Sequence, residues 1–141
     1  MYIQFMLESL LPYFAGIYFK LKAMITNFED RTKELNEYEL DTLLPIVVKG
    51  LNTKQGKDKA ITNSAICKAL KAMGYKISDV RLRKIIHYIR ANNIIPLLLA
   101  TSRGYYVSND SIEISDYIKS LDERINSITT VRDSLHYQLN R

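Results

Sequence analysis

Residues 78–108 read SDVRLRKIIHYIRANNIIPLLLATSRGYYVS, and this stretch decides the fold. Its first half repeats apolar residues at helical spacing, and Ser78 is a residue type that caps helix N-termini. Asn92 and Asn93 come next, and asparagine tolerates the left-handed backbone in which many helices end. The stretch therefore begins with a predicted helix whose apolar face carries Leu82, Ile85, Ile86 and Ile89.

A β-hairpin is predicted after this helix. The segment 94–101 is too short and too apolar to be anything but a buried strand or a core segment. Residues 102–104 supply a tight turn with Arg103 at its tip, and residues 105–107 return as the second strand. Pro96 has no N–H to donate to a ladder, so the first strand is an edge strand or begins after it.

The first clear helix of the chain is predicted after a polar linker at residues 27–35. Asn36 and Glu39 form a capping box at its start, and its apolar residues recur at helical spacing. Pro45 lies inside this pattern and should kink the helix or break it into two short pieces. A lysine-rich loop at residues 52–59 follows.

The second helix is predicted to start near Thr62 or Asn63, which are both good caps, and to stop at Gly74. Only a short connection separates Gly74 from Ser78. The second and third helices must therefore be neighbours in space, in a helix-turn-helix layout.

A last helix is predicted from a second capping box, Asp110 and Glu113, to the C-terminus. Its apolar residues are spaced four, three, four and three, which is the heptad spacing of helices that pair through a narrow seam. The residues of this seam are Ile114, Ile118, Leu121, Ile125 and Ile128. Val131, Leu135 and Leu139 continue it out of register after Arg132, as a stutter would. We expect a homodimer through this helix; the alternative is a helix folded back on its own domain.

The charge of the chain is concentrated in its middle. The net charge is +5, but residues 49–104 hold twelve basic residues against two acidic ones, so this segment carries +10 and the flanks together −5. Such a basic middle predicts a face that binds a polyanion. For Lys54, Lys57 and Lys59 alone, a solvated surface is the better interpretation.

The first 26 residues allow several interpretations. Their apolar run, residues 10–19, is about half the ~20 residues that a membrane span requires, and a signal peptide is not evident. The segment is a helix packed on the domain or on a partner, a membrane-surface anchor, or a leader to a native start at Met24. The single cysteine, Cys67, is interpreted as a small buried hydrophobe and fits a cytoplasmic location.

Sequence signatures of enzymes are missing. The chain has no metal-ligand spacing, phosphate loop, nucleophile elbow or dinucleotide fingerprint, and His87 and His136 fall on different predicted elements. We therefore expect a protein that is not an enzyme and that holds no metal and no cofactor.

Residues 36–108 resemble winged helix-turn-helix proteins, especially small ones of bacteria and their phages. The resemblance lies in the three helices, in GYKISDVRLRKIIHYIRANN and in the wing IIPLLLATSRGYYVS, and it covers about half of the chain. It implies double-stranded DNA as the partner, with the third helix in the major groove and the hairpin wing on the backbone or minor groove. A role in transcriptional control or in phage or plasmid DNA metabolism would fit. Winged helices also dock proteins, so a non-enzymatic adaptor is the alternative.

The resemblance assigns DNA contacts to the outer face of the third helix and to the wing. Arg81 and Lys84 are the candidates for base edges, Arg83 and Arg90 for phosphates, and Arg103 for a phosphate or a narrow minor groove. Arg90 has the alternative of pairing with an acidic residue of the last helix, and His87 that of an ordinary exposed histidine. The full candidate set is Thr62, Asn63, Ser64, Val80, Arg81, Arg83, Lys84, His87, Tyr88, Arg90 and Arg103.

The predicted fold class is mainly α with a small β-hairpin (α+β), a winged helix-turn-helix with a long C-terminal helix. We divide the chain into an apolar segment with its linker (1–34), the winged domain (35–108) and the C-terminal helix (109–141). Tyr105 and Tyr106 should point to opposite faces of the hairpin, one into the core and the other to the surface.

Overall fold

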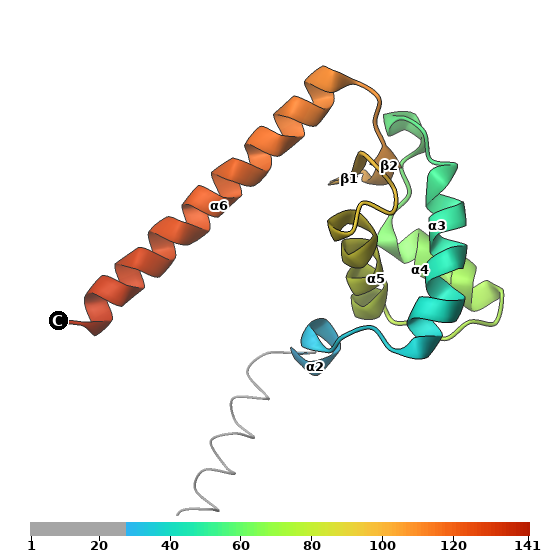
Figure 1. The fold of residues 1–141 in the computed structure, drawn as a ribbon, viewed down its shortest axis with the longest axis horizontal. Helices are drawn as coiled ribbons and strands as arrows, with labels where there is room; N and C mark the ends of the chain where they lie inside the picture. Colours follow the sequence, from blue (N-terminus) through green and yellow to red (C-terminus); the bar gives the residue numbers. More distant parts are fainter. Residues whose placement is uncertain (1–27) are drawn as a thin grey trace, which may run out of the picture. The chain divides into compact units, whose positions relative to one another are not determined.

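The computed structural model describes residues 28–141 (Figure 1). The chain divides into two units between Leu35 and Asn36. In the first unit the described part contains one short helix, α2 (Phe28–Thr32), in the stretch that was predicted as a linker. The predictions for residues 1–26 lie outside the described residues.

The second unit is mainly α-helical with a small β-hairpin and a long C-terminal helix, as predicted (Figure 1). Its elements are a π-helical turn η1 (Glu39–Leu43), α3 (Leu44–Asn52), a 3₁₀ turn η2 (Lys57–Lys59), α4 (Asn63–Ala72), α5 (Asp79–Ala91), β1 (Leu98–Thr101), β2 (Gly104–Val107) and α6 (Ser111–Leu139).

The capping box that opens the first helix is confirmed. The Glu39 N–H donates to Asn36 Oδ1 (2.8 Å), and the Asn36 N–H donates to Glu39 Oε2 (2.9 Å). The helix is made of two consecutive pieces, η1 and α3, which meet just before Pro45 without a gap between them, as the prediction of two short pieces allows. The five residues before α3 form a wide turn in which the Leu44 N–H donates to the Glu39 carbonyl, and Pro45 falls in the first turn of α3, where its missing N–H costs little.

The predicted boundaries of α4 and α5 are also confirmed. Thr62 Oγ1 accepts from the Ala65 N–H, and Ser78 Oγ accepts from the Arg81 N–H, each at 3.2 Å. Gly74 ends α4 with φ +88°, and Asn93 follows α5 with φ 54°. These left-handed residues let the next N–H groups bond back to the open carbonyls at each helix end.

β1 and β2 pair antiparallel, with Leu98 opposite Val107 and Thr101 opposite Gly104. β1 begins after Pro96, which was one of the two predicted alternatives. Ile94 lies outside β1 and is exposed. A third segment lines the other edge of β2. Ile61 exchanges two backbone hydrogen bonds with Tyr105 (3.0 and 2.8 Å).

The lysine-rich loop takes part in the same pairing. The Val107 N–H donates to the Lys54 carbonyl, and the Gly56 N–H donates to the Val107 carbonyl, each at 2.8 Å. The side chains of Lys57 and Lys59 are exposed, but the backbone of this loop is bound to the hairpin. In addition, Lys54 is half-buried and Lys57 Nζ lies 3.9 Å from Glu113 Oε1, so the prediction of a merely solvated loop fits Lys59 best.

Gly104 is required where the Ile61 segment crosses the hairpin. Its φ is +118°, and a Cβ at this position would lie 2.3 Å from the Ile61 carbonyl oxygen. Any other residue at the end of the turn would be strained and would push the third segment away from β2. The turn itself consists of Ser102 and Arg103.

The hydrophobic core joins α3, α4, α5 and the hairpin. Leu82, Ile85, Ile86 and Ile89 are fully buried, as the helical spacing predicted. The other buried apolar residues are Leu43, Val47, Leu51, Ile66, Cys67, Leu70, Ile95, Leu98, Leu99, Tyr106 and Val107. No helix within residues 28–141 is long and apolar enough to cross a membrane.

The second capping box is only half formed. Asp110 Oδ1 accepts from the N–H groups of Ile112 and Glu113, as predicted. The Glu113 side chain does not reach back to the Asp110 N–H. It accepts instead from the hydroxyls of Tyr106 and Ser108, each at 2.6 Å, and so ties the first turn of α6 to β2.

Candidate nucleic-acid interface

α4 and α5 pack against each other, and a hydrogen bond joins the starts of the two helices. Asn63 Nδ2 donates to the Asp79 carbonyl at 3.0 Å, while Asn63 Oδ1 is buried. The Asn63 amide is thus used to hold the two helices together, and the Thr62 hydroxyl caps α4. Of the three candidates at this helix start, Ser64 is the one whose exposed side chain has neither of these structural roles.

The position of Arg81 and Arg90 around α5 places both at the margin of its buried face. At 100° per residue, Arg81 and Arg90 lie about 90° to either side of the buried stripe, whereas Val80, Lys84 and His87 lie opposite it. An arginine at the margin of a buried face can reach polar groups on neighbouring elements. Both marginal arginines do so.

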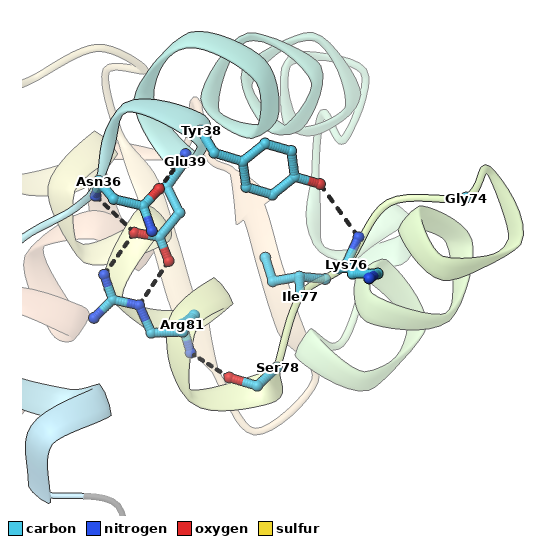
Figure 2. Close-up of a pocket in the computed structure, with 8 residues that line it drawn as sticks. All are labelled: Asn36, Tyr38, Glu39, Gly74, Lys76, Ile77, Ser78 and Arg81. Carbon is cyan, nitrogen blue, oxygen red and sulfur yellow. Dashed lines mark hydrogen bonds and ion pairs between the residues drawn. The ribbon is translucent and has the colours of Figure 1, made fainter.

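Arg81 forms a bidentate ion pair with Glu39, and this pair holds the start of α5 against the turn before α3 (Figure 2). Arg81 Nε and Nη2 donate to Glu39 Oε1 and Oε2, each at 2.6 Å, and the two side chains are only 13% and 6% exposed. The same carboxylate closes the capping box with the Asn36 N–H. This pairing removes Arg81 from the set that we propose to contact DNA.

The ion pair lies in the wall of an open hollow of about 760 Å³ (Figure 2). Tyr38 borders the same hollow, and its hydroxyl accepts a hydrogen bond from the Lys76 N–H at 3.2 Å. The hollow is lined by Asn36, Tyr38, Glu39, Gly74, Lys76, Ile77, Ser78 and Arg81. Because Glu39 and Arg81 neutralise each other, the hollow offers neither charge to a ligand.

Arg90 is directed to the other side of α5, toward the hairpin and α6. Its Nε donates to the Leu98 carbonyl (3.2 Å), its Nη2 donates to the Tyr117 hydroxyl (2.7 Å), and its guanidinium lies 5.7 Å from the Tyr117 ring centroid. The partner on α6 is therefore a tyrosine and not the acidic residue considered from the sequence. Arg90 is also removed from the proposed DNA contacts.

The outer face of α5 keeps the remaining candidates. Arg83, His87 and Tyr88 are exposed, and Val80 and Lys84 are half-buried. From residue 60 to residue 104, Asp79 is the one acidic residue of the sequence, against eight basic ones. α4 adds the exposed Lys68 and Lys71. The surface formed by α4 and α5 is therefore strongly basic even without Arg81 and Arg90.

The hairpin extends this surface. Arg103 is exposed in the turn, and its N–H donates to Thr101 Oγ1 (3.2 Å). Tyr106 is buried and Tyr105 is half-buried, which confirms that the two rings face opposite ways. Burial raises the pKa of Tyr105, while the positive charges of Arg83 and Arg90 oppose this rise. Tyr105 thus lies close enough to α5 to feel both guanidinium groups.

Cys67 belongs to the core, as predicted. Burial raises the pKa of its thiol to about 11, and a hydrogen bond with Asp79 acts in the same direction. A thiol with this pKa is protonated at neutral pH and is a poor nucleophile or metal ligand. Among residues 28–141 there is no group of three or more His, Cys, Asp or Glu residues that could hold a metal ion.

No protein-family model, no curated protein and no solved structure matches this chain. Its function therefore has to be inferred from the site itself.

The sequence indicated the basic outer face but not which arginines are structural. Glu39 and Tyr117 are the two residues that decide this, and neither was a candidate. Glu39 was recognised only as a cap, because its partner is 42 positions away in the sequence. The position around the helix is not a sufficient signal, because Arg83 lies only about 20° from Arg90 around α5 and is nevertheless exposed.

Proposed function

We propose that this protein binds double-stranded DNA as a winged helix-turn-helix, with α5 in the major groove and the β1–β2 hairpin on the backbone or in the minor groove. What supports the proposal is the order of the elements. Three helices are followed by a hairpin, and the Ile61 segment supplies a third strand-like edge to β2. Transcriptional control or phage or plasmid DNA metabolism would be suitable roles.

The observation that carries the proposal is the outer face of α5. One side of this helix is fully buried, and its remaining surface carries the exposed Arg83 at one flank and the exposed His87 opposite the buried side. A single helix fits the major groove, and the N-terminal half of such a helix reaches the base edges. Arg83 lies in that half and is exposed, so it can pair with guanine or with a phosphate.

The neighbouring elements supply contacts to the DNA backbone in this arrangement. The N–H groups at the start of α4 and the exposed Ser64 hydroxyl can donate to a phosphate. Arg103, at the tip of the hairpin, suits a phosphate or a narrow minor groove. Contacts of this type set orientation and salt dependence, whereas contacts from α5 set sequence preference.

The test is fluorescence anisotropy of the full chain with several unrelated labelled duplexes, comparing the wild type with Arg83→Ala and Lys49→Ala. Arg83→Ala should weaken binding about 5- to 100-fold, the range expected for one lost phosphate or base contact. Lys49→Ala is the matched control, because it removes one exposed positive charge from α3 and leaves α5 unchanged.

Equal effects of the two substitutions would mean that α5 does not carry the contact. No binding to any duplex at low salt, with the protein shown to be folded, would overturn the DNA proposal. The non-enzymatic docking adaptor would then be the better interpretation of the same surfaces.

A further inference from the structure

α6 exposes a long row of apolar side chains. Ile118, Ile125, Ile128, Leu135 and Leu139 are each between 53% and 82% exposed. None of the residues of α6 is buried. A helix of 29 residues with so much exposed apolar surface is expected to pack on something beyond its own domain.

The row keeps one register along the whole helix. α6 is continuous from Ser111 to Leu139, so the spacing can be followed through Arg132. The seam positions recur every four and three residues at Ile114, Ile118, Leu121, Ile125, Ile128, Arg132, Leu135 and Leu139. Counted in this way, only Val131 lies out of the register that was predicted to change after Arg132. Leu135 and Leu139 are in register, and one seam position is occupied by an arginine.

We propose that two copies of this chain pair through α6 in antiparallel orientation. This proposal goes beyond DNA binding and does not depend on it. The occupant of the seam is a second α6, because a heptad of this kind is complementary to itself. The orientation follows from the charge at Arg132.

A parallel pair would set the two Arg132 side chains against each other. In parallel two-stranded coiled coils, equivalent seam positions meet across the axis, so two guanidinium groups would share one apolar layer. The Arg132 side chain is 62% exposed in the single chain, and among residues 28–141 it pairs with its neighbour Asp133, at 2.7 Å. Such a surface pair contributes little and would not offset the repulsion.

An antiparallel pair removes this conflict. With Ile125 opposite the partner's Ile128, the remaining layers pair Leu121 with the partner's Arg132, Ile118 with the partner's Leu135, and Ile114 with the partner's Leu139. Arg132 then lies beside the partner's Asp122, which follows Leu121 in the sequence. Two symmetric ion pairs result, and every other layer is apolar.

The anchoring of α6 to its own domain leaves most of the seam exposed, with Ile114 and Leu121 half-buried. Glu113 binds Tyr106 and Ser108, and Tyr117 binds Arg90, so the first two turns of α6 are fixed on one side. Ile118, between these turns and the rest of the seam, is still 53% exposed. Because the helix spans about 43 Å, antiparallel pairing puts the two attachment points of α6 near opposite ends of the coil.

The test is a charge swap read by sedimentation equilibrium of the full chain. Arg132→Asp and Asp122→Arg should each weaken dimerisation on the order of 10-fold, because each sets like charges together twice per dimer. The double variant Asp122→Arg/Arg132→Asp should recover most of this loss. The control Glu123→Arg/Arg132→Asp makes the same charge changes one position along the helix, outside the seam, and should recover nothing.

A second measurement reads the orientation directly. A spin label on a cysteine introduced at the exposed Ser115 should report a separation of about 35 Å between copies in the antiparallel pair, against on the order of 10 Å in a parallel one. Cys67 is buried with a raised pKa and should remain unlabelled. The proposal would be overturned if the wild type stays monomeric at high concentration. It would also be overturned if the double variant Asp122→Arg/Arg132→Asp does not recover dimerisation, or if the labels lie at the separation expected for a parallel pair.

Discussion

At the scale of single residues, the roles of the arginines depend on which groups of neighbouring elements each side chain reaches. Arg81, Arg83 and Arg90 belong to one helix and carry the same charge. Arg81 and Arg90 reach Glu39 and Tyr117 from the edges of the buried stripe, and Arg83 stays exposed. A basic helix in a sequence therefore overstates the number of cations that can meet a polyanion, because some of them are used by the fold.

Replacing Arg81 should damage the fold and not merely the proposed DNA contact. Arg81→Ala leaves the nearly buried carboxylate of Glu39 without its cation, so we expect the free energy of unfolding to fall by about 3–5 kcal/mol. Arg83→Ala should change it by less than about 0.5 kcal/mol, as exposed substitutions usually do. Urea unfolding followed by circular dichroism measures both. Equal stability of the two variants would contradict the structural role of the ion pair.

At the scale of elements, local signals predicted most boundaries and missed what long-range contacts decide. Ser78, Thr62, Gly74 and Asn93 act within one turn of the chain, and the structure confirms their caps and stops. The wide turn before Pro45 and the pairing of the Ile61 segment with β2 were not predicted. Both depend on how distant parts of the chain pack together, which spacing alone does not encode.

The attachment of α6 to β2 depends on the hydrogen bonds of Glu113, which the sequence predicted only as part of a capping box. Hydrogen bonds from the Ser108 and Tyr106 hydroxyls lower the pKa of Glu113 below its usual value of 4.5. A group with a lowered pKa in the folded state stabilises the fold above its unfolded pKa, and this contribution is lost as the pH falls through the folded pKa. The attachment of α6 should therefore weaken only below about pH 4.5.

The check is to compare the wild type with Glu113→Gln in urea unfolding, from about pH 6 down to about pH 3. The difference in unfolding free energy between the wild type and Glu113→Gln should be constant near pH 6 and should shrink as the pH falls toward about pH 3. Glu123→Gln, an exposed residue of the same helix, is the control and should show no such difference. A Glu113→Gln difference that persists unchanged at the lowest pH would contradict the role given to the carboxylate.

At the scale of the whole molecule, the unit Asn36–Arg141 contains its own caps, core and hairpin. We therefore expect a chain that starts at Met24 to fold without residues 1–23. Its thermal unfolding by circular dichroism should remain cooperative, with a midpoint within a few degrees of the full chain. Loss of the cooperative transition would mean that the first residues complete the core, and the predicted domain boundary would be wrong.

The distribution of charge over the whole molecule determines how much of the proposed function could be predicted from the sequence. Composition pointed to a polyanion through the +10 segment, and the structure narrows the proposed contact surface to the outer face of α5, the start of α4 and Arg103. The sequence could not separate structural from exposed cations, because that depends on partners up to 42 residues away. The orientation proposed for two copies of α6 rests on the register of Arg132, counted along a helix that is continuous in the structure.

The most direct test of the central claim is the salt dependence of duplex binding by the full chain. If four to six phosphates are neutralised per protomer, the slope of log K against log salt should be roughly −4 to −5. Arg103→Ala should weaken all duplexes alike and make the slope shallower by about one unit. A folded protein that binds no duplex at low salt, or that binds with no salt dependence, would contradict DNA binding through this basic surface.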